Sequence, residues 1–138
     1  MSIQERENEI LEEFECFEDW MQKYEHIIEL GKDLPVIEEV FKTDDYLIKG
    51  CQSRVWLNAK FENGKVFFTA DSDAIITKGI VALLVRVLSG HGPQEIIDAK
   101  LAFLEQIGLK EHLSQTRANG LVSMIKQMKI YALAYLKG

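Results

Sequence analysis

Cysteine, proline and long apolar segments are all scarce in this 138-residue sequence. Its two cysteines, Cys16 and Cys51, cannot supply the four ligands of a structural zinc site by themselves. No apolar run approaches the roughly 20 residues that a membrane-spanning helix needs. Residues 1–7 are polar and acidic, whereas a secretory signal starts with basic residues and continues into an apolar stretch. We therefore expect a cytoplasmic protein that does not enter the membrane and whose thiols stay reduced.

Repeats, low-complexity stretches and linkers are also missing from the sequence. Hydrophobic residues make up 47% and charged residues 28%, an ordinary balance for a globular protein. A chain of this length can bury a core without the help of disulfides or a metal. We expect a single domain over residues 1–138.

Positive charge is in the minority, and the formal net charge is −6. Residues 1–45 contain 15 acidic and 4 basic residues, whereas residues 46–138 contain 7 acidic and 12 basic residues, so the two parts carry −11 and +5. This balance argues against nucleic acid as the main partner. Solvated helix faces explain the acidic part most simply. The alternative is that the basic part contacts an anionic partner or stabilises a thiolate.

Apolar residues at helical spacing predict helices at both ends of the chain. Ser2 and Glu5 form a capping-box pattern at the start of the first one. Asp71, Ser72 and Asp73 offer N-cap oxygens to a strongly apolar helix that we expect to be almost fully buried. The predicted helices span residues 3–14, 17–31, 36–41, 75–88, 93–97, 101–107 and 115–136.

The middle of the chain changes from helical to strand-like composition. Residues 55–61 and 65–70 are rich in β-branched and aromatic side chains. Asn63-Gly64 between them is a strong hairpin signal, and residues 46–48 have the composition of a third, short strand. This order of elements predicts an α+β fold with a small antiparallel sheet and helices packed on one face.

Cys51 is the strongest candidate for a chemically active residue. Its neighbours Lys49, Gly50, Gln52 and Ser53 are polar, basic or flexible, whereas structural cysteines usually lie within apolar runs. Such surroundings would favour the thiolate and leave room for the sulfur of a partner. From the residues alone, a half-buried loop cysteine without a role remains the alternative.

Simpler explanations fit the other candidate residues. We expect Cys16, which lies beside two phenylalanines, to pack between two helices, and His26 and His91 to be surface or helix-boundary residues. His112 remains a candidate neighbour of Cys51. Because Cys-x-x-Cys, dinucleotide-binding and phosphate-loop patterns are absent, neither thiol–disulfide exchange nor a nucleotide cofactor is supported.

Four segments, spread in order along nearly the whole chain, carry a resemblance to a known family. They are residues 24–31 with Leu34-Pro35, Gly50-Cys51-Gln52-Ser53 with Val55-Trp56, Asp71-Ser72-Asp73-Ala74 with Lys78-Gly79, and Arg117 with Gly120-Leu121 and Met124-Ile125. Together they resemble the SufE proteins of the sulfur-mobilisation system for iron–sulfur cluster assembly. One departure is Thr116 before Arg117, where the family often has a serine after a proline; Thr116 can replace that serine as a hydroxyl at the helix start.

The resemblance implies a fold shared with iron–sulfur scaffold proteins of the IscU type, and a homodimer in many members. It also implies a SufS-like cysteine desulfurase as partner, in which the pyridoxal phosphate would reside, so this chain is expected to bind no cofactor itself. Because the chain lacks the several cysteines of a cluster scaffold, it is expected to carry sulfur to a downstream iron–sulfur scaffold complex. It would then be a persulfide carrier that stimulates the desulfurase rather than a stand-alone enzyme.

Under this interpretation Cys51 accepts the sulfur. Lys49 and Arg54 are the cations nearest to it in sequence, and the resemblance adds Arg117. We expect Trp56 to form part of a pocket that shields the sulfur. Three other interpretations remain open at this point: a cysteine-dependent enzyme with a small substrate, a pure interaction module, and an iron–sulfur scaffold.

Overall fold

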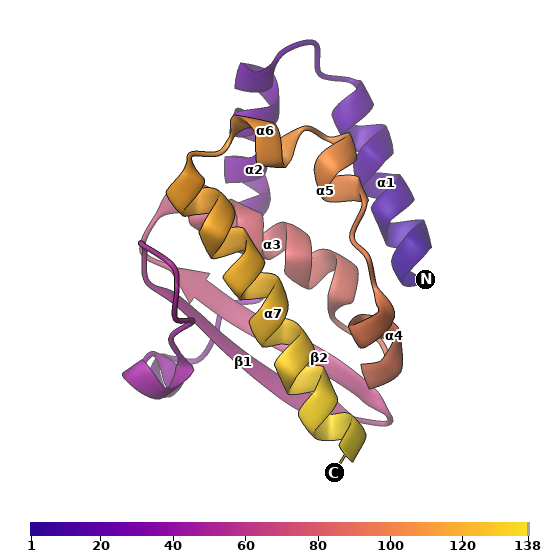
Figure 1. Ribbon diagram of the computed structural model, residues 1–138, viewed down its shortest axis with the longest axis vertical. Coiled ribbons are helices and arrows are strands. Elements are labelled where there is room, and N and C mark those ends of the chain that lie inside the picture. Colours follow the sequence, from indigo (N-terminus) through magenta and orange to yellow (C-terminus); the bar gives the residue numbers. More distant parts are fainter. Residues whose placement is uncertain (138) are drawn as a thin grey trace.

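A two-stranded hairpin and the helices packed against it form the fold (Figure 1). The computed structural model describes residues 1–137. Its elements are, in order, α1 (Ile3–Glu15), α2 (Trp20–Gly31), η1 (Glu39–Phe41), η2 (Asp44–Tyr46), β1 (Val55–Glu62), β2 (Lys65–Ser72), α3 (Ile75–Leu88), α4 (Pro93–Asp98), α5 (Phe103–Gln106), α6 (Leu109–His112) and α7 (Gln115–Lys137). The predicted α+β fold is confirmed.

The hairpin forms where the sequence predicts it. β1 and β2 pair antiparallel, with Glu62 opposite Lys65. Between them, Asn63 and Gly64 both adopt positive φ angles, 52° and 77°. A two-residue type I′ turn needs positive φ at both positions, and asparagine followed by glycine meets that need at the lowest cost.

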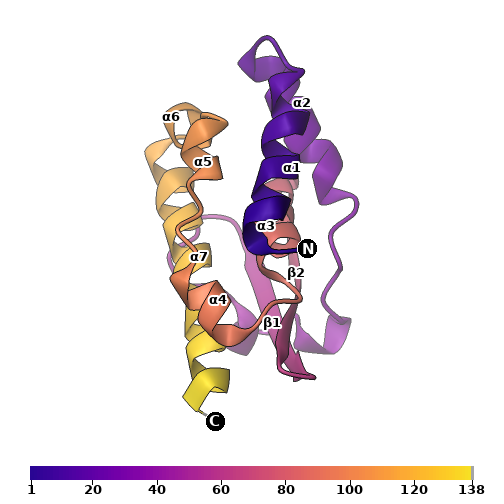
Figure 2. The ribbon, with the colours of Figure 1, turned by 90° about the vertical axis from the view of Figure 1, so that its right-hand side faces the viewer.

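The helices cover one face of this hairpin. The side chains of Val55, Leu57 and Ala59 alternate along β1 on the buried face. α7 crosses that face (Figures 1 and 2), and the hydroxyls of Tyr131 and Tyr135 donate to the carbonyls of Leu57 and Ala59, at 3.2 and 2.9 Å. Because side chains alternate along β1, every second residue faces the helices and the residues between them face away.

The segment after Pro35 does not form the predicted helix. Val36 instead makes a single parallel bridge to Ala70 on the free edge of β2. The N–H of Ala70 donates to the Pro35 carbonyl and the N–H of Ile37 donates to the Ala70 carbonyl, both at 3.1 Å. Only Glu39–Phe41 keeps a helical turn, of the 3-10 type. The sheet edge satisfies backbone groups that an isolated short helix would leave open.

The third strand predicted at residues 46–48 is reduced to one bridge. Leu47 pairs with Trp56, and the N–H of Ile48 donates to the Val55 carbonyl at 2.8 Å. The chain before it turns in the 3-10 helix η2, so it meets the sheet edge only briefly.

The start of α3 differs from the expected capping. The predicted helix is confirmed, but its N-cap position is Ala74, which offers no side-chain bond. Asp71 instead forms ion pairs with Lys42 at 2.6 Å and Lys78 at 3.3 Å, and the Asp73 carboxylate accepts the Arg54 N–H at 3.0 Å. These carboxylates are bound across the fold, so they are not used as helix caps.

Other boundaries move by a few residues. The Ser2 capping box is present as predicted. α2 begins later than expected, after Asp19, whose carboxylate accepts the Gln22 N–H at 2.9 Å. The hydroxyl at the start of α7 belongs to Ser114, which accepts the Arg117 N–H at 3.3 Å, so the role expected of Thr116 is corrected. A short helix, α6, lies between the helices predicted at residues 101–107 and 115–136.

Helices α2 and α3 cross in direct backbone contact. A Cβ atom on Gly79 would lie 2.1 Å from the Ile27 carbonyl oxygen, and one on Gly31 would lie 3.0 Å from the Gly79 nitrogen. A Cβ on Gly79 is incompatible with this approach, and a Cβ on Gly31 would make a tight contact. No helix within residues 1–137 is long and apolar enough to span a bilayer.

Candidate functional site

Cys51 lies on the loop that leads into β1, beside the first turns of α7. Its Sγ is 3.6 Å from the carbonyl oxygen of Gly120, a distance at which the thiol donates a weak hydrogen bond. The side chain is half-buried. The loop places the sulfur against two helices, with a helix carbonyl as its polar neighbour.

A small cavity of about 70 Å³ opens beside this sulfur. Three segments build it: the Cys51 loop, the first turns of α3 and the first turns of α7. Its lining consists of Cys51, Gln52, Ser53, Thr77, Ile80, Thr116, Arg117, Gly120 and Met124. A single water needs roughly 10–15 Å³ of such space, so the cavity has room for at least one further sulfur atom.

Two glycines, Gly50 in the loop and Gly120 on α7, allow the Cys51 loop to pack closely against α7. A Cβ atom on Gly120 would lie 3.5 Å from Sγ, within the space next to the sulfur. Gly50 has φ of 94°, in the left-handed region that other residues rarely adopt, and a Cβ there would come 2.4 Å from the Ser123 hydroxyl. The loop therefore packs directly on α7, and glycine is required at its turn.

The electrostatics of the thiol differ from the expectation. Burial raises the pKa of the Cys51 thiol above its ordinary value. The prediction that polar and basic neighbours favour the thiolate in the resting protein is therefore not supported, because burial is the cause of the shift. At neutral pH the resting side chain is a thiol.

The predicted cations separate in space. Of the three, Arg117 lines the cavity, on an exposed turn of α7. Lys49 instead lines a different groove, between η2 and α7, together with Lys126. Arg54 has an exposed side chain, and its carbonyl accepts the Ser72 hydroxyl at 2.8 Å.

Trp56 does not line the cavity, contrary to expectation. Strand side chains alternate, so the neighbour of the buried Val55 points to the opposite face of the hairpin. There the Lys42 Nζ lies 5.8 Å from the centre of a Trp56 ring. The shielding of Cys51 comes from α3 and α7.

The other sequence candidates lie elsewhere. His112 stacks on Trp20, with ring centroids 4.3 Å apart, and its Nδ1 lies 2.9 Å from the Gly108 carbonyl oxygen. Cys16 is exposed at the end of α1, so its predicted packing role is wrong. The cavity lining contains neither a histidine nor a carboxylate that could act as a base for Cys51.

Sequence reasoning missed Thr77 and Gly120 as site residues. Thr77 is the one uncharged polar side chain in the α3 sequence, which is otherwise apolar, glycine or basic. Gly120 occupies the interior of a helix, where glycine costs stability. Each residue is unusual for the interior of a helix, and this unusual composition is the signal that could have identified them as site residues.

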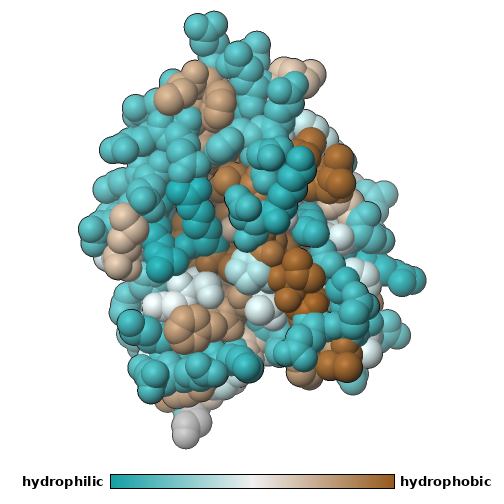
Figure 3. Space-filling model, turned by 180° about the vertical axis from the view of Figure 1, so that it is seen from behind, coloured by the Kyte–Doolittle hydropathy of each residue, from teal (hydrophilic) through white to brown (hydrophobic). Residues whose placement is uncertain are grey.

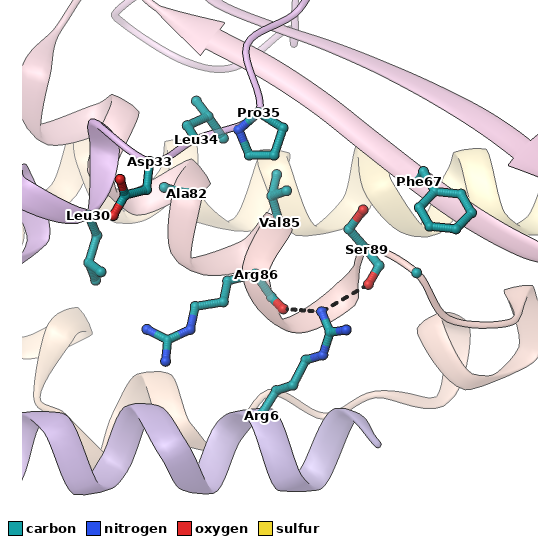
Figure 4. Close-up of a pocket in the computed structure, with 11 residues that line it drawn as sticks. Arg6, Leu30, Asp33, Leu34, Pro35, Phe67, Ala82, Val85, Arg86 and Ser89 are labelled. Atoms are coloured by element: carbon teal, nitrogen blue, oxygen red, sulfur yellow. Dashed lines mark hydrogen bonds between the residues drawn. The ribbon is translucent and has the colours of Figure 1, made fainter. Parts of the chain in front are cut away.

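A groove lined largely by apolar side chains lies away from the thiol, at the other end of α3. It has a volume of about 510 Å³, and apolar side chains gather in a hollow on this rear face (Figure 3). Figure 4 shows Arg6 reaching across it, where Nη1 donates to the carbonyls of Arg86 and Ser89 at 2.7 and 3.1 Å. Arg6 thus satisfies carbonyls at the C-terminus of α3, and no cysteine lines this groove among the described residues.

Comparison with known proteins adds an independent observation. Residues 8–132 match the family model SufE, described as an Fe-S metabolism associated domain. An uncharacterized SufE-like protein of Rhizobium meliloti is 41% identical over 128 residues, which covers 88% of this chain and 91% of that protein. A second one, from Synechocystis, is 38% identical over 94% of this chain and 81% of its own length.

Two further matches extend this picture. The chloroplastic/mitochondrial SufE-like protein 1 of Arabidopsis thaliana is 40% identical over 91% of this chain, but the match covers 34% of that longer protein. A hypothetical protein from Thermus thermophilus, solved in solution, matches with a TM-score of 0.79 at 20% identity, over 96% of this chain and 97% of that one. At this identity the second match supports the fold alone.

Proposed function

Because this chain belongs to the SufE family and so has a role in Fe–S metabolism, we propose that it accepts sulfur from a cysteine desulfurase. The acceptor atom is Sγ of Cys51. The observation that carries the proposal is a half-buried cysteine with a cavity of about 70 Å³ at its sulfur. A persulfide needs that space for one additional sulfur and needs protection from reductants.

The proposed reaction is a transfer of sulfur between two cysteines. The desulfurase carries a cysteine persulfide, and the Cys51 thiolate attacks its outer sulfur. A sulfur–sulfur bond forms at Cys51 as the bond within the donor persulfide breaks, and the donor cysteine leaves as a thiolate. No external oxidant or reductant is needed, because the persulfide sulfur moves without change in overall oxidation state.

Docking would have to activate the resting thiol. Burial holds the pKa of Cys51 above its ordinary value, and only the thiolate is a strong nucleophile. The loop contains Gly50 at a left-handed turn, where the backbone can rearrange with little steric cost. We propose that the partner draws the loop out of its cavity, which returns the thiol to a more polar environment and presents it to the donor.

The wider partnership follows from the same proposal. The partner is a SufS-like desulfurase that contains the pyridoxal phosphate, and the product persulfide passes to an iron–sulfur scaffold complex. A homodimer and a cytoplasmic location also remain proposals. The Arabidopsis relative is named as chloroplastic/mitochondrial, so the compartment of the desulfurase decides where such a protein acts.

Mass spectrometry tests the acceptor role directly. Incubation with a desulfurase and free cysteine should add one sulfur atom to the Cys51 peptide. Cys16→Ser is the matched control, because Cys16 is exposed and outside the cavity, and this variant should load normally. Cys51→Ser should neither load nor stimulate desulfurase turnover.

The same variants separate the alternatives. A Cys51→Ser protein that stimulates the desulfurase as well as the unmodified chain would refute the acceptor role and identify an interaction module. A small-molecule enzyme would need a base near the thiol, and the cavity lining offers neither histidine nor carboxylate.

A further inference from the structure

One buried polar side chain in residues 1–137 stands apart from the others. Four polar or charged residues are buried: Glu7, Asp71, Thr77 and His91. Glu7 accepts the Phe103 N–H, Asp71 forms ion pairs with two lysines, and His91 contacts two backbone carbonyls. The Thr77 hydroxyl makes no hydrogen bond to any described residue.

Thr77 lies in the first turn of α3 and lines the Cys51 cavity. It is 6% exposed. A threonine in a helix can bond to the carbonyl three or four residues earlier, and Thr77 makes no such bond to a described residue. Every side-chain nitrogen or oxygen within residues 1–137 that is completely sealed has a partner, so the Thr77 hydroxyl is not completely sealed, and Thr77 lines the cavity.

We propose that the Thr77 hydroxyl binds the outer sulfur of a persulfide on Cys51. This inference rests on the proposed function, since it names a group that holds the transferred sulfur. A persulfide is a stronger acid than its parent thiol, so its outer sulfur carries negative charge near neutral pH. An anion in a half-buried cavity requires a hydrogen-bond donor, and Thr77 supplies one without adding charge.

This assignment gives the Thr77 hydroxyl a bond that forms only after sulfur loading. The resting hydroxyl is not completely sealed, so removing it should change the stability of the resting protein little. Valine has nearly the same shape as threonine, and Thr77→Val should therefore keep the resting fold while weakening its hold on the sulfur.

The test loads sulfur chemically and omits the desulfurase. In a Cys16→Ser background, tetrasulfide reacts with the Cys51 thiolate: a bond forms between Sγ and a terminal sulfur, and trisulfide leaves. Cyanide then removes the outer sulfur as thiocyanate and leaves the Cys51 thiolate. Thr77→Val should release thiocyanate roughly tenfold faster, the effect expected for losing one hydrogen bond to a charged group.

Three controls make the result specific. Thr77→Ser keeps the hydroxyl and should restore slow release. Thr69→Val, on the other face of the hairpin, makes the same chemical change away from the cavity and should have no effect. Thermal unfolding of Thr77→Val should occur close to the temperature of the parent, which separates loss of the sulfur bond from damage to the fold.

Equal release rates from Thr77→Val and its parent would overturn the inference, as would failure of tetrasulfide to load Cys51. The proposed function fails separately. If the desulfurase does not load Cys51 but the chemically loaded protein depends on Thr77, the sulfur-binding group is correct and the donor is not.

Discussion

Gly120→Ala should raise stability and impair sulfur loading at the same time. The new Cβ would lie 3.5 Å from Cys51 Sγ and 3.9 Å from the Cys51 Cα and Cβ, which are ordinary contact distances. The fold therefore accepts the methyl group. Replacing glycine by alanine within α7 should stabilise the protein by about 0.5–1 kcal/mol, which corresponds to a rise in melting temperature of roughly 2–4 °C.

The same substitution should reduce the volume of the cavity beside Cys51. The new methyl group would lie directly beside Sγ, in a cavity of only about 70 Å³. It would take space that a second sulfur needs. We expect several-fold slower gain of persulfide at Cys51, with contacts elsewhere unchanged.

Paired measurements of thermal unfolding and persulfide mass test this reasoning. Asn119→Ala is the matched control, since it also places alanine in α7 but at an exposed position next to the cavity glycine. It should stabilise slightly and load normally. A Gly120→Ala protein that gains sulfur as fast as the unmodified chain would show that the space beside Sγ is not where the second sulfur lies.

Three further predictions concern the thiols and the helix crossing. Iodoacetamide should modify the exposed Cys16 well before Cys51 at neutral pH, as peptide mapping would show; faster modification of Cys51 would contradict its burial. Because burial raises the pKa of Cys51, the native state keeps the thiol proton to higher pH than the unfolded chain. The stabilising contribution of this protonated thiol is lost as pH rises through the native pKa. Cys51→Ala should therefore reduce the alkaline fall in the free energy of unfolding. Gly79→Ala would place a Cβ 2.1 Å from the Ile27 carbonyl oxygen, so we expect a loss of about 2–3 kcal/mol or more in chemical denaturation, and a native-like midpoint would refute the close crossing.

The parts of the fold that local chemistry determines could be predicted from the sequence. The Asn63-Gly64 turn, the Ser2 capping box and the long apolar α3 each depend on residues close in sequence. The segment after Pro35 could not be predicted in the same way. Its backbone bonds to Ala70 across the sheet edge, a partner that a local pattern does not reveal.

The same distinction between local and distant contacts applies to the site. Cys51 could be identified from the sequence because its neighbours are unlike those of a structural cysteine. Its raised pKa and its cavity could not be predicted, because the cavity residues Thr77 and Gly120 come from helices distant in sequence. Trp56 was misplaced for a geometric reason: closeness in sequence does not bring a side chain to the same face when strand residues alternate.

The crossing of α2 and α3 at Gly31 and Gly79 limits how the thiol can be presented. Backbones in contact cannot slide without breaking their packing, so the α3 turn that bears Thr77 is anchored immediately next to this crossing. The wall on the side of Cys51 has no such anchor, since it is a loop that turns at Gly50. A partner that opens the cavity should therefore leave the threonine in place and carry the cysteine away from it, so that the bound sulfur parts from its hydroxyl donor only at the moment of delivery.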